Sequence, residues 1–185
     1  MEPPRSLAGD LYGPDWIIGD GRDDGHRRHP HQSASLGGRR KRGAFVHAIG
    51  RSRGGRTTKI HAVSDPRGRP VAFLLTPGNI ADISAAPHVL AKIPAPRRLI
   101  ADKAYDAKSL RDWLTERGGT AVIPPNPTRK HPARYDAKLY RQRNLIERMF
   151  CRLKDFRRIA TRYDKRADNF LSAVLIVATL VWWLN

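Results

Sequence analysis

Cysteine is nearly absent from this sequence, and acidic residues are few. The 185 residues include one cysteine, Cys151, so neither a disulfide framework nor a cysteine-based zinc site can form within one chain. Such sparing use of cysteine is natural in a reducing cytoplasm, where we expect the protein to reside, associated with the bacterial nucleoid. The length suits a single domain with a substantial core.

The shortage of acids leaves a large positive charge. Lys and Arg number 35 against 17 Asp and Glu, which gives a formal net charge of +18, far more than solubility requires. A field of this sign attracts polyanions, because Lys and Arg neutralise phosphates in nonspecific nucleic-acid binding. DNA binding and ribosomal-type RNA binding fit the charge equally well. The charge therefore selects a class of partner and no particular activity.

Membrane and nucleotide signals are also missing. The start, MEPPRSLAGD, lacks the basic-then-apolar order of a secretory signal. The charge-free run at 170–184 is 15 residues long, whereas a bilayer core needs about 20, so we expect a buried helix and no membrane partner. Residues 50–59 are rich in Gly and basic residues but lack the GxxxxGK[ST] order, which excludes nucleotide binding by a P-loop.

Residues 1–45 differ in character from the remainder. They hold clusters of Gly, Arg, His and Asp with WII as the one apolar stretch, a composition that predicts a poorly ordered basic segment. His26, His29 and His31 lie close together here. No Cys or acidic partner stands at a recognised zinc spacing, so an exposed loop is favoured over a metal site. Residues 46–185 are predicted to form the folded domain.

The pattern after Arg56 predicts alternating strands and helices. TTKIHAV and VAFLL flank the turn-forming DPRGRP and indicate a β-hairpin, and RRLIAD and TAVIP indicate short buried strands. Helices are expected from an Asp82 cap to about residue 92, from an Asp106 cap to Gly118-Gly119, and from 136 to 158, after the Pro-rich basic loop PPNPTRKHPARY. This order favours an α/β fold with helices covering a sheet.

The last of these helices carries a stripe of chemically active side chains. Tyr140, Arg143, Glu147 and Lys154 fall at offsets 0, 3, 7 and 14, which a helix advancing about 100° per residue brings within roughly 60°. A carboxylate flanked by cations suits a site that holds a metal ion beside phosphates. The simpler explanation of the stripe alone is a solvated helix face with Arg/Glu pairs.

The pattern Tyr-x2-Arg-x3-Glu-x6-Lys resembles the signature of bacterial insertion-sequence transposases of the DDE type, most closely the group typified by insertion sequence five. The similarity continues through GRSRGGRTTKIHAV, TPGNIAD and LIADKAYD, and so covers most of residues 43–184. It implies a ribonuclease-H-like mixed sheet flanked by helices. It further implies a DNA transposase that cuts and transfers DNA strands, acting as a homo-oligomer on the double-stranded ends of its element and on target DNA.

The resemblance also implies site residues. Two divalent ions, Mg²⁺ or Mn²⁺ in its place, are held about 4 Å apart by carboxylates from separate elements. Asp102, at the end of an apolar strand, and Glu147 match two of these ligands; an N-cap is the other role open to Asp102. DNA contacts are expected from a set of basic and phenolic side chains: Tyr140, Arg143, Lys154, Arg51, Arg53, Arg56 and Lys59. For Tyr140, packing against the core is the alternative role.

The first aspartate of the set is the least regular. Counting back seven residues from His31 gives Asp24 as a catalytic and metal-binding residue, with Asp20 and Asp23 as rivals. GHRRHP lacks β-branched residues and contains a proline, so it is a poor central strand. We therefore expect the first strand to be missing or unstable, through a shifted reading frame or a degraded copy. The alternative function is then a catalytically inactive DNA-binding remnant of a transposase.

Overall fold

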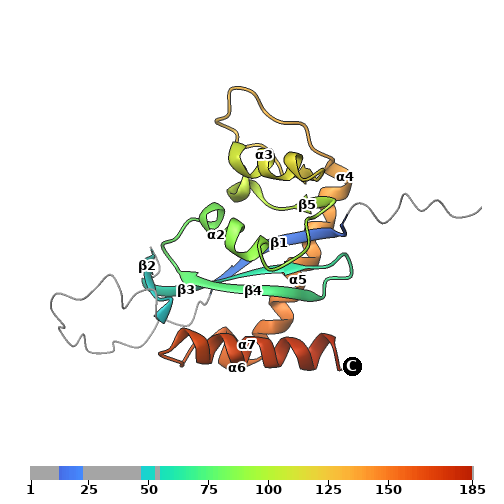
Figure 1. The fold of residues 1–185 in the computed structure, drawn as a ribbon. Coiled ribbons are helices and arrows are strands. Elements are labelled where there is room, and N and C mark those ends of the chain that lie inside the picture. Colours follow the sequence, from blue (N-terminus) through green and yellow to red (C-terminus); the bar gives the residue numbers. More distant parts are fainter. Residues whose placement is uncertain (1–12, 23–46, 53–54, 185) are drawn as a thin grey trace, which may run out of the picture.

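The chain forms a mixed β-sheet in the computed structural model, which describes residues 13–22, 47–52 and 55–184 (Figure 1). The strands in these residues are β1 (Asp15–Arg22), β2 (Gly50–Ser52), β3 (Gly55–Ser64), β4 (Pro70–Pro77), β5 (Arg98–Ile100) and β6 (Thr120–Val122). The sheet order is β4, β3, β1, β5, β6, and β2 pairs with the start of β3. β1, β5 and β6 are mutually parallel, so their carboxyl ends meet at one edge.

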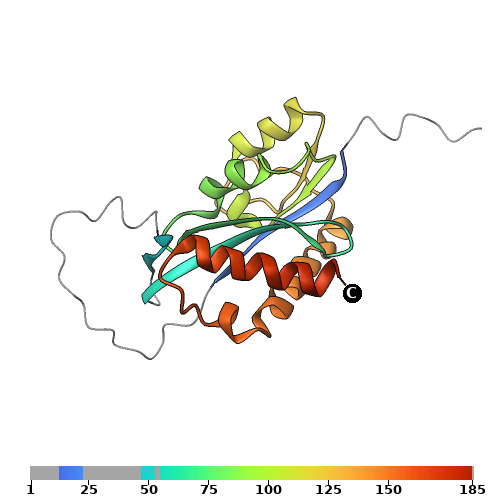
Figure 2. The same cartoon turned by 60° about the horizontal axis from the view of Figure 1, so that its bottom comes forward.

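Helices cover both faces of this sheet (Figures 1 and 2). One face is covered by α2 (Asp82–Leu90), α3 (Lys108–Glu116) and the 3-10 turn η2 (Lys103–Tyr105). The other is covered by α5 (Asn144–Lys154), α6 (Arg157–Ala160) and α7 (Ala167–Trp182). A short helix, α4 (Ala137–Tyr140), and a second 3-10 turn, η3 (Arg141–Arg143), lead directly into α5. The ribonuclease-H-like α/β architecture is confirmed.

Alternation along β1 separates the two hydrophobic cores. Ile17 packs in the core beneath α5 and α7, whereas its neighbour Ile18 packs in the core beneath α2 and α3. Gly21 faces α5, and a Cβ added there would lie 2.5 Å from the ring of Phe150. The absence of a side chain at Gly21 therefore lets α5 lie close against β1. This contact fixes the helix that carries Glu147 beside the sheet.

The expected loss of the first strand is wrong for residues 15–22. β1 is a complete strand between β3 and β5, and both Ile17 and Ile18 are fully buried. The sequence pattern hid it because the glycines Gly19 and Gly21 stand where side chains would face α5, which leaves no apolar alternation after WII. Asp24 lies outside the described residues.

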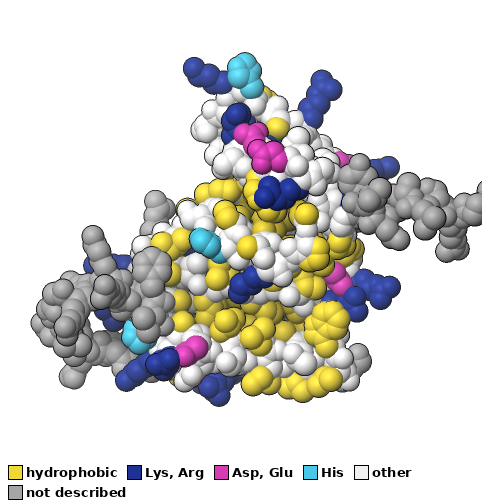
Figure 3. Space-filling model, viewed as in Figure 1, with side chains coloured by type: hydrophobic (Ala, Val, Ile, Leu, Met, Phe, Trp, Pro, Cys, Tyr) yellow, Lys and Arg dark blue, Asp and Glu magenta, His cyan; other side chains and the backbone are white. Residues whose placement is uncertain are grey.

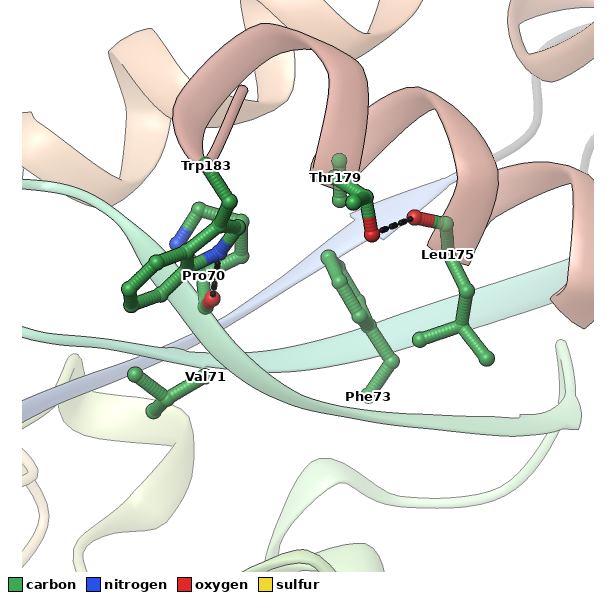
Figure 4. A pocket seen from close by; sticks show the side chains of 7 residues that line it. Pro70, Val71, Phe73, Leu175, Thr179 and Trp183 are labelled. Carbon is green, nitrogen blue, oxygen red and sulfur yellow. Dashed lines mark hydrogen bonds between the residues drawn. The ribbon is translucent and has the colours of Figure 1, made fainter. Parts of the chain in front are cut away.

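The later elements follow the prediction closely. β3 and β4 form the hairpin, and β5 and β6 are the two short strands. The C-terminal apolar run forms most of α7, but the expectation of a buried helix is wrong for its outer face, where Leu175, Ile176 and Leu180 are exposed. The inner face packs on β4 beside a shallow apolar pocket, where the Trp183 ring N–H donates to the Pro70 carbonyl at 3.3 Å (Figure 4). Among the described residues, no helix combines the length and apolar character that crossing a bilayer requires.

Two predicted helix caps are wrong. α2 and α3 begin after Ala81 and Ala107, and neither residue provides a side-chain cap. Asp82 is the first residue of α2, and its carboxylate pairs with Lys59 at 2.7 Å. The carboxylate of Asp106 likewise pairs with two arginines, Arg111 and Arg129. These carboxylates bond to the cations instead of the N–H groups at the helix starts.

Candidate active site

The predicted stripe lies on a nearly continuous helical segment, residues 137–154. Asp136 caps it at the expected start, since its carboxylate accepts hydrogen bonds from the backbone N–H groups of Lys138 and Leu139. The segment ends at Lys154 rather than at residue 158, and α6 follows after a break. Ile146 and Phe150 of α5 are buried against the sheet, which leaves Glu147 on the outer side of the helix.

Arg143 joins the two carboxylates that the sequence selected. Its guanidinium donates to Glu147 Oε1 at 2.5 Å and to Asp102 Oδ2 at 3.3 Å. Glu147 is one helical turn further along the same segment, whereas Asp102 follows β5. Arg143 Nε is buried and has no hydrogen-bond partner. Burial lowers the pKa of Arg143, but the charges of Asp102 and Glu147 outweigh it, so that the pKa is raised.

Asp102 divides its two oxygens between two partners. Oδ2 accepts from Arg143, and Oδ1 accepts from the backbone N–H of Ala104 at 2.8 Å, which caps η2. The capping role and the contact with the signature segment therefore coexist. Asp102 comes two residues after the end of β5, at the edge where the parallel strands end. Polar side chains at this edge of such sheets face the ligand crevice.

Asp20 is one of two aspartates on β1; the other, Asp15, is paired with Arg98 at the start of β5. Asp20 pairs in register with His61 of β3, and its charge acts on the hydroxyl of Tyr105, as does that of Asp102. Tyr105 is fully buried; burial and then the charges of Asp20, Asp82 and Asp102 raise its pKa. A single buried phenol thus lies within electrostatic range of both aspartates.

His61, on β3, is the buried neighbour of the Tyr105 hydroxyl. Its ring nitrogens lie 2.8 Å from the Thr76 hydroxyl and 3.5 Å from the Tyr105 hydroxyl, and the residue is fully buried. Burial lowers the pKa of His61 to about 4, against the opposing charge of Asp82. The ring is therefore neutral near pH 7, and it adds no charge beneath the carboxylates.

The remaining predicted DNA contacts have different surroundings. Tyr140 is half-buried and meets Tyr135 edge-to-face at 5.7 Å, and burial is the main cause of its raised pKa. Lys154 is the last residue of α5, partly buried. Arg51 and Arg56 are exposed and face each other in the β2–β3 pair. Arg53 lies outside the described residues.

The expected DNA contact of Lys59 is wrong. Its side chain is 7 % exposed, and its ammonium donates to Asp82 at 2.7 Å and to the Ile80 carbonyl at 2.8 Å. Lys59 follows two exposed arginine positions in sequence, but β3 enters the core at Thr58, so strand position overrides the local charge pattern. The buried ion pair fixes the TPGNIAD loop and the start of α2 against the sheet.

Replacement of Lys59 by alanine is expected to lower the free energy of unfolding by about 3 kcal/mol, because Asp82 is left buried without its cation. Urea unfolding followed by circular dichroism measures this loss. Arg56→Ala, an exposed position on the same strand, is the matched control and should change stability by less than about 0.5 kcal/mol. Equal stability of Lys59→Ala and the wild type would contradict the structural role of this pair.

The two acidic residues that sequence reasoning did not rank highest are Asp20 and Asp106. The seven-residue spacing favours Asp24 over Asp20, whereas the apolar WII that ends two residues before Asp20 is the signal that indicates a strand. Asp106 ends the LIADKAYD block and was interpreted as a cap. Its side chain is completely buried, and no local sequence pattern predicts this burial.

The mixed sheet has the strand order of a ribonuclease-H-like domain, and Arg143 joins Asp102, after β5, to Glu147 of α5 at one edge of it. The family model described as "Transposase DDE domain" matches residues 17–182, and the chain belongs to this family. It is therefore a DNA transposase domain of the insertion-sequence type, and enzymes of this family use divalent metal ions.

Relatives agree with this assignment. The chain is 39% identical over 127 residues to a protein assigned as the transposase for insertion sequence element IS6501 of Brucella ovis; the alignment covers 68% of this chain and 98% of that protein. It is 30% identical over 137 residues to the protein assigned as the transposase for IS402 of Burkholderia cepacia, covering 68% of this chain and 63% of the relative, so under two thirds of that protein's length is matched.

A solved structure shares the fold. The simian T-cell lymphotropic virus intasome in complex with PP2A regulatory subunit B56 gamma contains a chain that superposes with a TM-score of 0.51 at 15% identity, covering 95% of this chain and 50% of the other. At this level of identity the likeness concerns the fold alone.

Proposed function

We propose that this chain hydrolyses a phosphodiester at the ends of its insertion element and directs the freed 3′-hydroxyl onto target DNA, with Mg²⁺ as cofactor. The observation that carries the proposal is the shared guanidinium of Arg143, which contacts Asp102 and Glu147 at once. Two carboxylates from separate elements that hold one cation between them have the charge and the donor chemistry to hold another.

The donor set fits a hard divalent cation. Asp102 and Glu147 offer carboxylate oxygens, and Mg²⁺ is usually bound through one or two carboxylates with water and substrate oxygens completing the shell. When bound, such ions activate the attacking hydroxyl and stabilise the leaving oxygen. Among the described residues, no three His, Cys, Asp or Glu side chains already stand close enough to share an ion. A third carboxylate has to come from β1 or from the residues after it.

Asp20 is the third carboxylate that we propose, in place of Asp24. Asp20 lies on β1 beside β5, and its charge and that of Asp102 act on the same Tyr105 hydroxyl. This shared neighbour supports a common site for the two aspartates. Arg143 and Lys154, on the helical segment, would then contact the phosphates near the scissile bond, and exposed Arg51 and Arg56 the backbone further along.

The assay that tests the proposal uses purified protein and supercoiled plasmid carrying the element ends. Nicking and joined products are measured with Mg²⁺, with Mn²⁺ and with EDTA, and binding of the same end fragments is measured in parallel. Metal-dependent nicking supports the enzyme. Binding without any metal-dependent nicking supports the alternative, a catalytically inactive DNA-binding remnant. We further propose that the active form is a homo-oligomer on DNA, which crosslinking with and without end fragments tests.

The substitutions Asp20→Asn and Asp24→Asn are expected to have very different effects on nicking in this assay. Asp20→Asn should lower metal-dependent nicking by about 10²-fold or more, because a ligand oxygen loses its charge, while Asp24→Asn should leave most of the activity. Initial rates at saturating Mg²⁺ compare the two. The reverse order of effects would return the first-ligand role to Asp24.

A further inference from the structure

A Pro-rich basic loop, residues 124–136, joins β6 to α4 and is fastened by one buried carboxylate. The Asp106 side chain is 0% exposed. It accepts from Arg111 Nε at 2.9 Å and from the backbone N–H of Asn126 at 2.8 Å, and Arg129 Nε lies 3.1 Å from its second oxygen. Both a backbone group and a side chain of the loop are thus held at the same carboxylate.

Additional bonds stiffen the same stretch. Arg111 also donates to the Ile123 carbonyl at 2.8 Å, and the Asn126 side chain accepts from the backbone and hydroxyl of Thr128. Burying a carboxylate with its partners carries a large desolvation cost, so such clusters contribute little net stability. The cluster instead fixes the conformation of residues 123–129. It also connects this stretch to the segment that carries Asp102, which lies four residues before Asp106.

The loop carries two further basic residues, Lys130 and Arg134, besides Arg129, which is paired with Asp106. Residues 124–135 include Arg129, Lys130 and Arg134 and no Asp or Glu, and the carboxylate of Asp136 is occupied by backbone N–H groups. Lys130, His131 and Arg134 are exposed. The loop lies along the β6 side of the molecule, at the top of Figure 1, where Figure 3 shows Lys, Arg and His side chains projecting.

We propose that this braced loop is a duplex-DNA-binding surface that contacts the phosphate backbone beside the carboxylate pair; the proposal rests on the proposed function. A rigid loop loses little conformational freedom on binding, so its cations bind phosphates at a lower entropic cost than those of a free segment. The loop starts at the sheet edge where β5 and β6 end, the same edge that holds Asp102. DNA whose phosphate lies at the carboxylates continues past this surface.

The test measures binding of an element-end duplex by fluorescence anisotropy in EDTA, so that no cleavage occurs. Lys130→Ala/Arg134→Ala is compared with Arg67→Ala/Arg157→Ala, which removes two exposed arginines from the β3–β4 turn and from α6, away from β6. The loop variant is expected to bind about 10-fold more weakly or worse at 0.1 M salt, with the slope of log K against log salt reduced by about 2. The control should change neither quantity appreciably.

Asp106→Asn tests the brace. It should speed tryptic cleavage after Arg129 and Lys130 and weaken duplex binding in the same direction; if it does not fold, the Lys130/Arg134 variant still decides. Unchanged affinity of the loop variant, an equal loss in the control, or tighter binding of duplex RNA at matched salt would overturn the proposal. Failure of the proposed catalytic function is distinct, because it would abolish nicking without altering this metal-free binding.

Discussion

Glutamine at position 147 is expected to reduce metal-dependent DNA nicking by about 10³-fold while leaving duplex affinity within about twofold of the wild type. The substitution keeps the shape of the side chain and removes the charge that an ion requires, so that transition-state stabilisation is lost and backbone contacts remain. Asp102→Asn should behave in the same way. Initial nicking rates on element-end plasmid, together with anisotropy on the same sequence, measure the two quantities.

The matched control for Glu147→Gln is Glu116→Gln. Glu116 is an exposed carboxylate at the end of α3, on the opposite face of the sheet, and its change should leave nicking intact. Because Glu147 is 58 % exposed, its replacement should alter stability little, and unfolding curves verify this. A Glu147→Gln protein that nicks DNA at the wild-type rate would remove the carboxylate pair from the mechanism.

The parts of the fold that local periodicity encodes were predictable from the sequence. The β3–β4 hairpin, the two short strands and the helical stripe follow from spacing and turn residues, which are properties of neighbours along the chain. The offsets of the stripe also selected Glu147 and Arg143, and the structure places both in contact on one helical segment.

The parts that depend on tertiary packing were not predictable. β1 has glycines where α5 approaches, so its pattern carries the short apolar run WII but no apolar alternation after it. Lys59 lies in a basic stretch but enters the core with its strand, and Asp106 caps nothing because two arginines reach it from elsewhere. A partner distant in sequence contributes in each case: α5 for β1, Asp82 for Lys59, and Arg129 for Asp106, which is also held by Arg111 five residues away.

Replacement of Arg143 is expected to tighten metal binding even as it weakens activity. The guanidinium of Arg143 pairs with Asp102 and Glu147, so a divalent ion that binds these carboxylates competes with it for their oxygens. Arg143→Ala removes the competitor and leaves two carboxylates that repel each other unless an ion lies between them.

The affinity for Mn²⁺ should rise about 10-fold in Arg143→Ala, as measured by electron paramagnetic resonance on metal-free protein. This increase corresponds to the low end of the free energies of charge-assisted hydrogen bonds, because Glu147 is largely exposed to solvent. Arg143→Lys keeps one positive charge without the fork and should fall between the two. Nicking by Arg143→Ala should decline, since the proposed phosphate contact is lost. Weaker Mn²⁺ binding in Arg143→Ala would contradict this prediction. It would mean that the guanidinium positions the two carboxylates for the ion, and that Asp102 and Glu147 move apart by mutual repulsion when the guanidinium is removed.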